Sequence, residues 1–196
     1  MTENEWTLSI CEKLQESLSS KKLVVDTLVK IPYSQEITNY SSDWEPEYYK
    51  PDKFETDLAI FEKSKEKFIP RVIVEAKLGT VTTHDAITYS YKAEKHKNIT
   101  PFIRYGIMIG DRKNYPLPGR LFRHGTNFDF MFCFTDIKPN NEEWDSFVSM
   151  ILKEFKYSRT VEEMLHESKN KERKHYYMMQ KQLVLKEMSN DKKKNN

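Results

Sequence analysis

The sequence contains few cysteines. Only Cys11 and Cys133 occur among its 196 residues, far apart and outside any CxxC pair. This spacing argues against a disulfide framework and against a thiolate zinc site. We therefore expect both side chains to be small buried groups in a protein of the reducing cytoplasm.

Net charge is almost absent as well. Lys and Arg total 32 and Asp and Glu total 30, which gives a formal net charge of +2. The chain as a whole therefore does not attract nucleic acid strongly, although local basic faces can still do so. Charge balance alone neither supports nor excludes a DNA partner.

Long apolar runs are missing too. No stretch approaches the roughly 18 to 20 apolar residues that span a bilayer. The segment from Met1 to Trp6 is polar and acidic, where a secretion signal is basic and then apolar. We therefore expect a cytoplasmic protein with no membrane partner, built as one globular domain or as one domain with a helical arm.

Three segments are expected to form helices. Residues 7–18 and 140–156 have the apolar spacing of amphipathic helices, and Asn141 is a candidate cap for the second. A further helix is expected over residues 85–97, capped by Thr82 or Thr83 and ended by Pro101. Its inner face is predicted to carry these side chains: Ala86, Ile87 and Tyr91.

Four apolar segments have the composition of strands. Residues 56–60 and 72–74 are joined by a short charged segment, which favours an antiparallel hairpin. The other two segments are residues 102–110 and 128–134. Residues 22–30 fit either a strand or a continuation of the first helix, and the polar residues 32–53 are expected to form a long loop.

The composition changes near residue 158 to helix formers and charge. Residues 160–188 are expected to form a helical arm, and the final residues DKKKNN to be disordered. This predicts a core domain over residues 1–158 and an arm with a lysine-rich tail over residues 159–196. The apolar side chains of the arm should be buried on the core or on a second subunit: Met164, Leu165, Tyr176, Met179 and Leu183.

Charged residues lie at unusual places in the predicted hairpin. Asp57 precedes the apolar part of its first strand, and Glu75 and Lys77 end the second. Because side chains alternate along a strand, Glu75 and Lys77 point to one face and Ala76 to the other. If the hairpin pairs as predicted, Asp57 can approach both charged side chains.

This set of groups suits phosphate chemistry. Two converging carboxylates bind a hard divalent cation such as Mg²⁺, and the Ala76 backbone carbonyl is a further candidate ligand. A lysine beside them can orient or deprotonate an attacking water and can stabilise charge that builds up on a phosphate.

Asp57 followed by Glu75-Ala76-Lys77 resembles the PD-(D/E)XK nuclease superfamily, over about residues 5–135. The resemblance implies an α/β fold with a mixed central β-sheet flanked by helices, a restriction-endonuclease-like core. It also implies Mg²⁺-dependent hydrolysis of DNA, with Mn²⁺ as a substitute ion. Asp57 and Glu75 would be the metal ligands and Lys77 the catalytic lysine. Members often add an acidic residue from a helix before the core, for which Glu12 is the candidate and Glu16 the second choice.

Other polar residues are candidates for DNA contacts. Tyr89, Lys92 and Lys95 could face the phosphate backbone, or could belong to a solvated helix face. Arg120, Arg123 and His124 lie in a segment bounded by glycines, which could enter a groove as an arginine-bearing loop or could face solvent.

Among nucleases, the sequence looks most like a small type II restriction endonuclease. Such enzymes commonly act as homodimers on double-stranded DNA, and the sequence predicts no nucleotide cofactor. Two alternatives stay open. One is a structure-specific nuclease of repair, recombination or mobile elements, and the other is a catalytically silent DNA-binding subunit.

Overall fold

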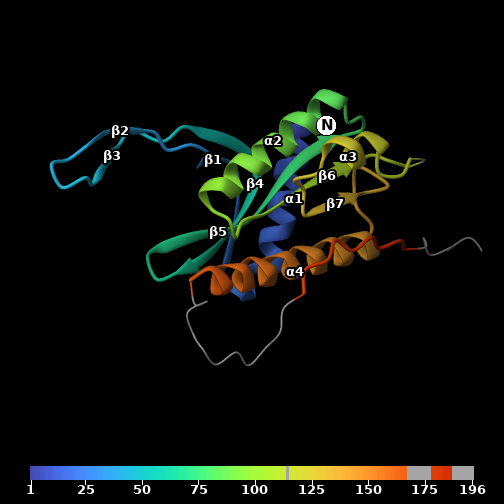
Figure 1. Cartoon of the computed structure of the whole chain (residues 1–196). Coiled ribbons are helices and arrows are strands. Elements are labelled where there is room, and N and C mark those ends of the chain that lie inside the picture. The colour runs from blue at the N-terminus through green and yellow to red at the C-terminus, as the bar shows by residue number, and fades with distance from the viewer. Residues whose placement is uncertain (114, 167–177, 187–196) are drawn as a thin grey trace, which may run out of the picture.

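A five-stranded mixed sheet forms the centre of the molecule (Figure 1). The computed structural model describes residues 1–113, 115–166 and 178–186. The strands lie in the order β1-β4-β5-β6-β7. The first three pair antiparallel and the last three pair parallel. Their bounds are Leu23–Pro32, Lys53–Ser64, Lys67–Leu78, Arg104–Gly110 and Phe130–Cys133.

Helices cover both faces of this sheet, so the predicted α/β class is confirmed (Figure 1). Helices α1 (Glu3–Leu18) and α4 (Asn141–His166) share one apolar cluster with Val72 and Val74 of β5. Helices α2 (Thr83–Ile99) and α3 (Gly119–His124) share the other cluster with Ile73. Alternate residues of β5 thus enter opposite layers, as the side-chain alternation of a strand requires. A short 3₁₀ turn, Ser19–Lys21, links α1 to β1.

The predicted hairpin is confirmed as β4 and β5, with both strands longer than expected. Only Lys65 and Glu66 separate the two strands. Lys65 adopts a positive φ of 55°, which suits a tight turn. The charged segment that looked like a connecting loop is therefore mostly strand.

Helix α2 begins as predicted but buries a different face. Thr82 caps it through a reciprocal pair of hydrogen bonds with Asp85. The prediction of its inner face was wrong for Ile87 and Tyr91, which are about half exposed. Ala86 is buried as predicted. The other buried side chains of the helix are small or polar: Ser90, Ala93 and His96.

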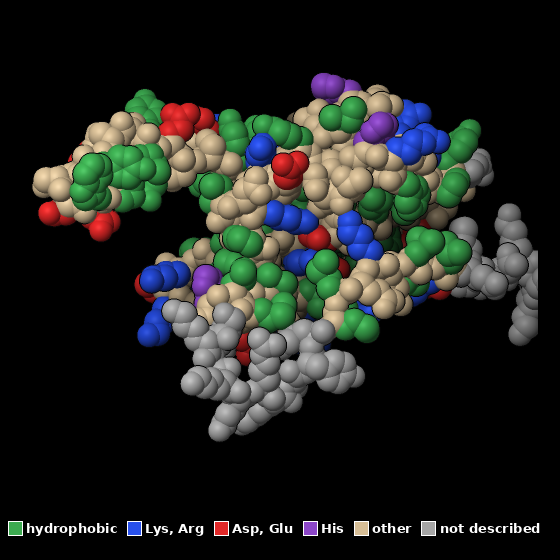
Figure 2. Space-filling model, viewed as in Figure 1, with side chains coloured by type: hydrophobic (Ala, Val, Ile, Leu, Met, Phe, Trp, Pro, Cys, Tyr) green, Lys and Arg blue, Asp and Glu red, His purple; other side chains and the backbone are tan. Residues whose placement is uncertain are grey.

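The polar segment predicted as a loop contains a second, two-stranded sheet. Strands β2 (Ile37–Tyr40) and β3 (Pro46–Tyr48) pair antiparallel and project away from the body of the molecule (Figure 1). Hydrophobic side chains gather on this projecting hairpin (Figure 2). Those exposed to solvent are Ile37, Tyr40, Trp44, Tyr48 and Tyr49.

The C-terminal region differs from the predicted arm. The proposed boundary at residue 158 falls inside α4, which continues without a break to His166. The described residues 178–186 contain no helix, so the prediction of a helix is wrong there. Tyr176 and the DKKKNN tail lie outside the described residues.

Two smaller expectations are also answered. Cys11 is buried as predicted, whereas Cys133 is partly exposed. No helix in the described part of the chain is both long enough and apolar enough to cross a bilayer.

Candidate active site

The β4–β5 pairing brings Asp57 to Glu75. Leu58 pairs with Val74, so the next positions along the two strands, Asp57 and Glu75, face each other. The Asp57 Oδ2 atom accepts a hydrogen bond of 2.8 Å from the backbone N–H of Ala76. The Ala76 side chain packs in the cluster with α1 and α4, on the opposite face from the contacts of Glu75.

Glu75 is fully buried, with 0% of its surface exposed. Its Oε1 atom accepts hydrogen bonds from the Tyr105 hydroxyl and, at 2.8 Å, from the Lys92 ammonium. Its Oε2 atom is buried and has no hydrogen-bond partner among the described residues. Such an oxygen carries a desolvation cost that a bound cation or a proton would offset.

Burial also sets the protonation of Glu75. Removal from water raises the pKa of its carboxyl to about 7; Lys92 opposes this rise and Asp57 adds to it. Tyr89 responds to the same surroundings, since burial and the Asp57 charge raise its pKa to about 12. The cluster is thus a dry environment with competing charges, which is typical of functional sites.

Lys77 is held as a cation. Its ammonium lies 3.1 Å from Glu3 Oε1 and 3.6 Å from Asp85 Oδ1. Burial lowers the pKa of Lys77, but Tyr89 and Glu3 together raise it by more. The net pKa therefore lies above its ordinary value. Lys77 is therefore a hydrogen-bond donor and a positive charge at neutral pH.

An acidic residue does come from the first helix, but it is Glu3. The Glu3 carboxylate bonds to Lys77 and accepts a hydrogen bond of 3.0 Å from the backbone N–H of Leu78. Glu12 lies nine residues further along α1, about 13 Å at the rise of a helix, and its side chain is exposed. The structure therefore does not bring Glu12, or the exposed Glu16, to the cluster. The capping box between Thr2 and Glu5 marks the true helix start and was the missed signal.

Lys92 and Tyr89 were expected to face the DNA backbone or to lie on a solvated helix face, but both turn inward. The Lys92 side chain is 12% exposed. Its ammonium also donates a hydrogen bond of 2.8 Å to the backbone carbonyl of Glu55. The half-buried Tyr89 ring lies beneath the ammonium groups of Lys77 and Lys92, at 5.7 and 5.3 Å. These two residues therefore belong to the buried group around Glu75 and Lys77, and they do not form an outer helix face.

The arginine-bearing segment is not a loop but the short helix α3. Arg120 donates a hydrogen bond of 2.9 Å to the backbone carbonyl of Val81, which fixes its side chain against the protein. Arg123 is exposed and His124 is partly exposed. A DNA contact stays a prediction for all three residues.

The residues present fit a small hard cation. Within the described ranges, no group of three or more His, Cys, Asp and Glu side chains could hold a metal. Mg²⁺ is usually held by one or two carboxylates and keeps several waters, so it does not need such a group. Asp57, the partnerless oxygen of Glu75 and the Ala76 carbonyl provide a donor set of the right chemistry.

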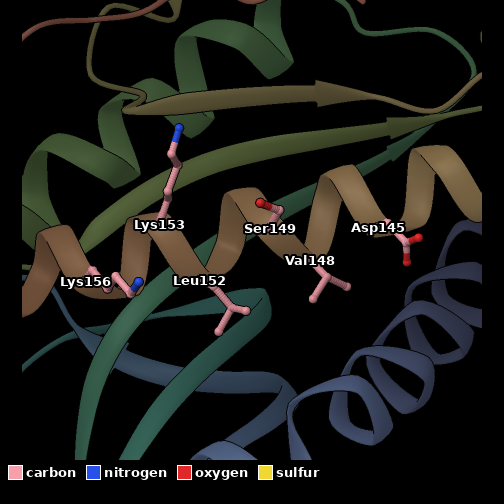
Figure 3. A pocket seen from close by; sticks show the side chains of 6 residues that line it. All are labelled: Asp145, Val148, Ser149, Leu152, Lys153 and Lys156. Atoms are coloured by element: carbon pink, nitrogen blue, oxygen red, sulfur yellow. The ribbon is translucent and has the colours of Figure 1, made fainter.

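Two shallow grooves of the described surface lie away from this cluster. One of about 460 Å³ runs along α4 (Figure 3), and one of about 500 Å³ lies near Glu62 and Arg71. The α4 groove is lined by Val148, Leu152 and four polar residues. Neither groove contains a residue of the candidate site, so the site is identified by its chemistry and not by a cavity.

No family model and no curated protein matches the chain. Among solved structures, the chain is similar to the restriction endonuclease BsaWI in the crystal structure of its pre-specific complex with DNA. The two sequences are 14% identical and the TM-score is 0.45. The similarity covers 84% of this chain and 63% of that chain.

Proposed function

We propose that this protein is a Mg²⁺-dependent endonuclease that hydrolyses phosphodiester bonds in double-stranded DNA. One observation carries the proposal: Asp57 and Glu75 meet at neighbouring strand positions, with Lys77 following on β5 and a buried carboxylate oxygen left without a partner. A purely structural ion pair does not require a partnerless oxygen, because an unmade hydrogen bond to a buried group costs stability.

Each residue has a chemical role in this proposal. Asp57, Glu75 and the Ala76 carbonyl would hold Mg²⁺, which when bound polarises the phosphate and activates water. Lys77 orients the attacking water and stabilises the negative charge that develops on the phosphate. Glu3 and Asp85 hold the Lys77 ammonium in place from two sides, at 3.1 and 3.6 Å.

We further propose a type II restriction endonuclease that acts as a homodimer. The support for association is the exposed apolar surface of residues 178–186, where Met178, Met179 and Leu185 are 80 to 88% exposed. Surfaces of this kind are typical of interaction sites. Light scattering should therefore give twice the chain mass for the full chain and one chain mass after truncation at His166. An unchanged mass would remove these residues from the interface.

The proposed activity is tested by incubating the purified protein with unmethylated phage DNA, with Mg²⁺ or with EDTA. Lys77→Ala is the test variant. Lys113→Ala is the control, because Lys113 is an exposed lysine that pairs with Asp136, outside the candidate site. Discrete fragments that require both Mg²⁺ and Lys77 support a sequence-specific nuclease. Branched and nicked DNA serve as further substrates. Cleavage of these alone favours the structure-specific alternative, and intact DNA in every lane contradicts the proposal.

A further inference from the structure

Lys92 makes the strongest unexplained contact of the candidate site. It projects from α2 and places its ammonium 2.8 Å from Glu75 Oε1. The other described donor to Glu75 is the Tyr105 hydroxyl, which is neutral. Lys92 is therefore the positive charge in direct contact with a carboxylate that is cut off from water.

The surroundings of this ammonium resemble those of a bound cation. Its other contacts are the Glu55 carbonyl at 2.8 Å and the face of the Tyr89 ring at 5.3 Å. Carboxylate and carbonyl oxygens are also the ligands that hard divalent cations prefer. The ammonium thus supplies beside Glu75 a positive charge of the kind that Mg²⁺ would supply.

We propose that Lys92 is a positioning residue that neutralises Glu75 in the metal-free protein and competes with the divalent cation for its carboxylate. The inference rests on the proposed metal site at Asp57 and Glu75. A divalent cation at Glu75 feels direct repulsion from an ammonium 2.8 Å from the same carboxylate. Cation binding therefore weakens or breaks the contact between Lys92 and Glu75.

The second acceptor of Lys92 lets the ammonium stay hydrogen-bonded when its contact with Glu75 weakens. An ammonium has three donors, and one of them already bonds to the Glu55 carbonyl. When the Oε2 atom of Glu75 takes up the cation and the contact of Lys92 with Oε1 weakens, Lys92 keeps this hydrogen bond and its place over Tyr89. The metal-free site therefore holds Glu75 in position without leaving its charge unpaired, and the loaded site needs only a small movement of Lys92.

The experiment is calorimetric titration with Ca²⁺ in the absence of DNA. Ca²⁺ takes oxygen ligands as Mg²⁺ does, and the readout does not depend on cleavage. The proteins are the wild type, Lys92→Met, Lys92→Arg and the control Lys95→Met. The titration is run at pH 8.5, above the pKa of about 7 to which burial raises the Glu75 carboxyl, to limit competition by protons.

Removal of the competing charge should raise the affinity of Lys92→Met for Ca²⁺ by roughly tenfold. Lys92→Arg and the Lys95 control should stay near the wild type. Thermal unfolding provides a second readout. Without a cation, Lys92→Met should melt below the wild type because Glu75 loses its partner, and saturating Ca²⁺ should close most of this gap.

A merely structural role would give a different pattern. If the Met variant melted lower by the same amount with and without Ca²⁺, or bound Ca²⁺ no more tightly than the wild type, the inference would be overturned. Should Lys92→Met not fold, ¹⁵N signals of the lysine ammonium groups in the wild type decide the matter. Ca²⁺ should shift the Lys92 signal most, and an unchanged signal overturns the inference. A wild type that binds no divalent cation overturns both the inference and the proposed function, whereas binding that ignores Lys92 overturns the inference alone.

Discussion

The β4–β5 hairpin buries a glutamate near each of its ends, and the two carboxylates differ in how fully they are paired. Near the turn, Glu62 bonds to Arg71 at 2.8 Å and also to Arg159 of α4. The hydrogen bond from Arg159 lowers the pKa of Glu62, and Arg71 adds to this effect. At the other end, burial raises the pKa of Glu75, and one of its oxygens has no partner in the described structure.

Under the proposed function, the difference is one between charge used for structure and charge available for chemistry. Arg71 is 2% exposed and bonds to Glu62 and, at 2.7 Å, to Glu162, so this network ties the hairpin to α4. The donors of the two arginines are matched by carboxylate oxygens. The Glu75 end is less fully paired, which is the state expected of a site that takes up a cation.

The largest effect should follow a change at the incompletely paired end. Glu75→Gln keeps the shape of the side chain but removes its charge, so cleavage of DNA should fall by about a thousandfold or more. Stopped-time assays on a plasmid provide the measurement, and far-UV circular dichroism confirms the fold. Cleavage at a rate within tenfold of the wild type would show that Glu75 holds no essential cation.

The reverse should hold at the paired end. Arg71→Met leaves Glu62 and Glu162 without their central partner, and breaking a buried ion pair costs about 3 to 5 kcal/mol of unfolding free energy. Urea denaturation measures this loss. Calcium affinity of the folded fraction should match that of the wild type, and a parallel loss of affinity would mean that the two ends are coupled.

The pH dependence of stability should differ between the two ends. A carboxyl whose pKa is raised on folding binds its proton more tightly in the native state, so its stabilising contribution is lost as pH rises from about 4.5 to about 7. In the metal-free protein, ionisation of Glu75 should thus lower the free energy of unfolding by about 3 kcal/mol between pH 4 and pH 8. Urea denaturation of Glu75→Gln across this range should lack that decline.

The contribution of Glu62 to stability should change with pH in the opposite direction. Its pKa is lowered on folding, so its contribution is present at neutral pH and is lost as pH falls below about 4.5. Glu62→Gln should therefore be destabilising at pH 7 and nearly neutral in strong acid. An equal cost at both pH values would show that packing of the side chain, and not its charge, is responsible.

The smallest effect is expected for Arg159→Met. The Arg159 side chain is 56% exposed, and solvent screens its interaction with Glu62. Exposed ion pairs contribute about 0 to 1 kcal/mol, so its cost in urea denaturation should be well below that of Arg71→Met. A cost as large as that of Arg71→Met would place the two arginines in one cooperative unit.

The sequence predicted the central sheet better than it predicted the β2–β3 hairpin and the C-terminal region. The β-branched run Val72, Ile73 and Val74 predicted a strand, and the side-chain alternation of a strand correctly put Ala76 on the opposite face from Glu75. These features depend on local spacing. The assignment of Asp57, Glu75 and Lys77 to catalysis stays a prediction.

What the sequence did not reveal depends on contacts between distant segments. Glu3 reaches Lys77 across 74 positions of the chain, and its position follows from how α1 crosses the sheet. Lys92 was expected to face the DNA backbone or to lie on a solvated helix face. Its actual side-chain direction depends on how α2 sits over β4 and β5, which the sequence does not show. Ile87 and Tyr91 were misplaced for the same reason, since helical spacing alone does not say which apolar face meets the sheet.

The β2–β3 hairpin has a consequence for how this protein can change. None of the residues of β2 and β3 belongs to either apolar cluster, and nearly all of them are exposed. Substitutions, insertions and deletions there alter no core packing, so they cost little in stability. The hairpin is joined to β4, which carries Asp57 four residues after Lys53. The chain can therefore vary this projection without altering the sheet that carries Asp57, Glu75 and Lys77.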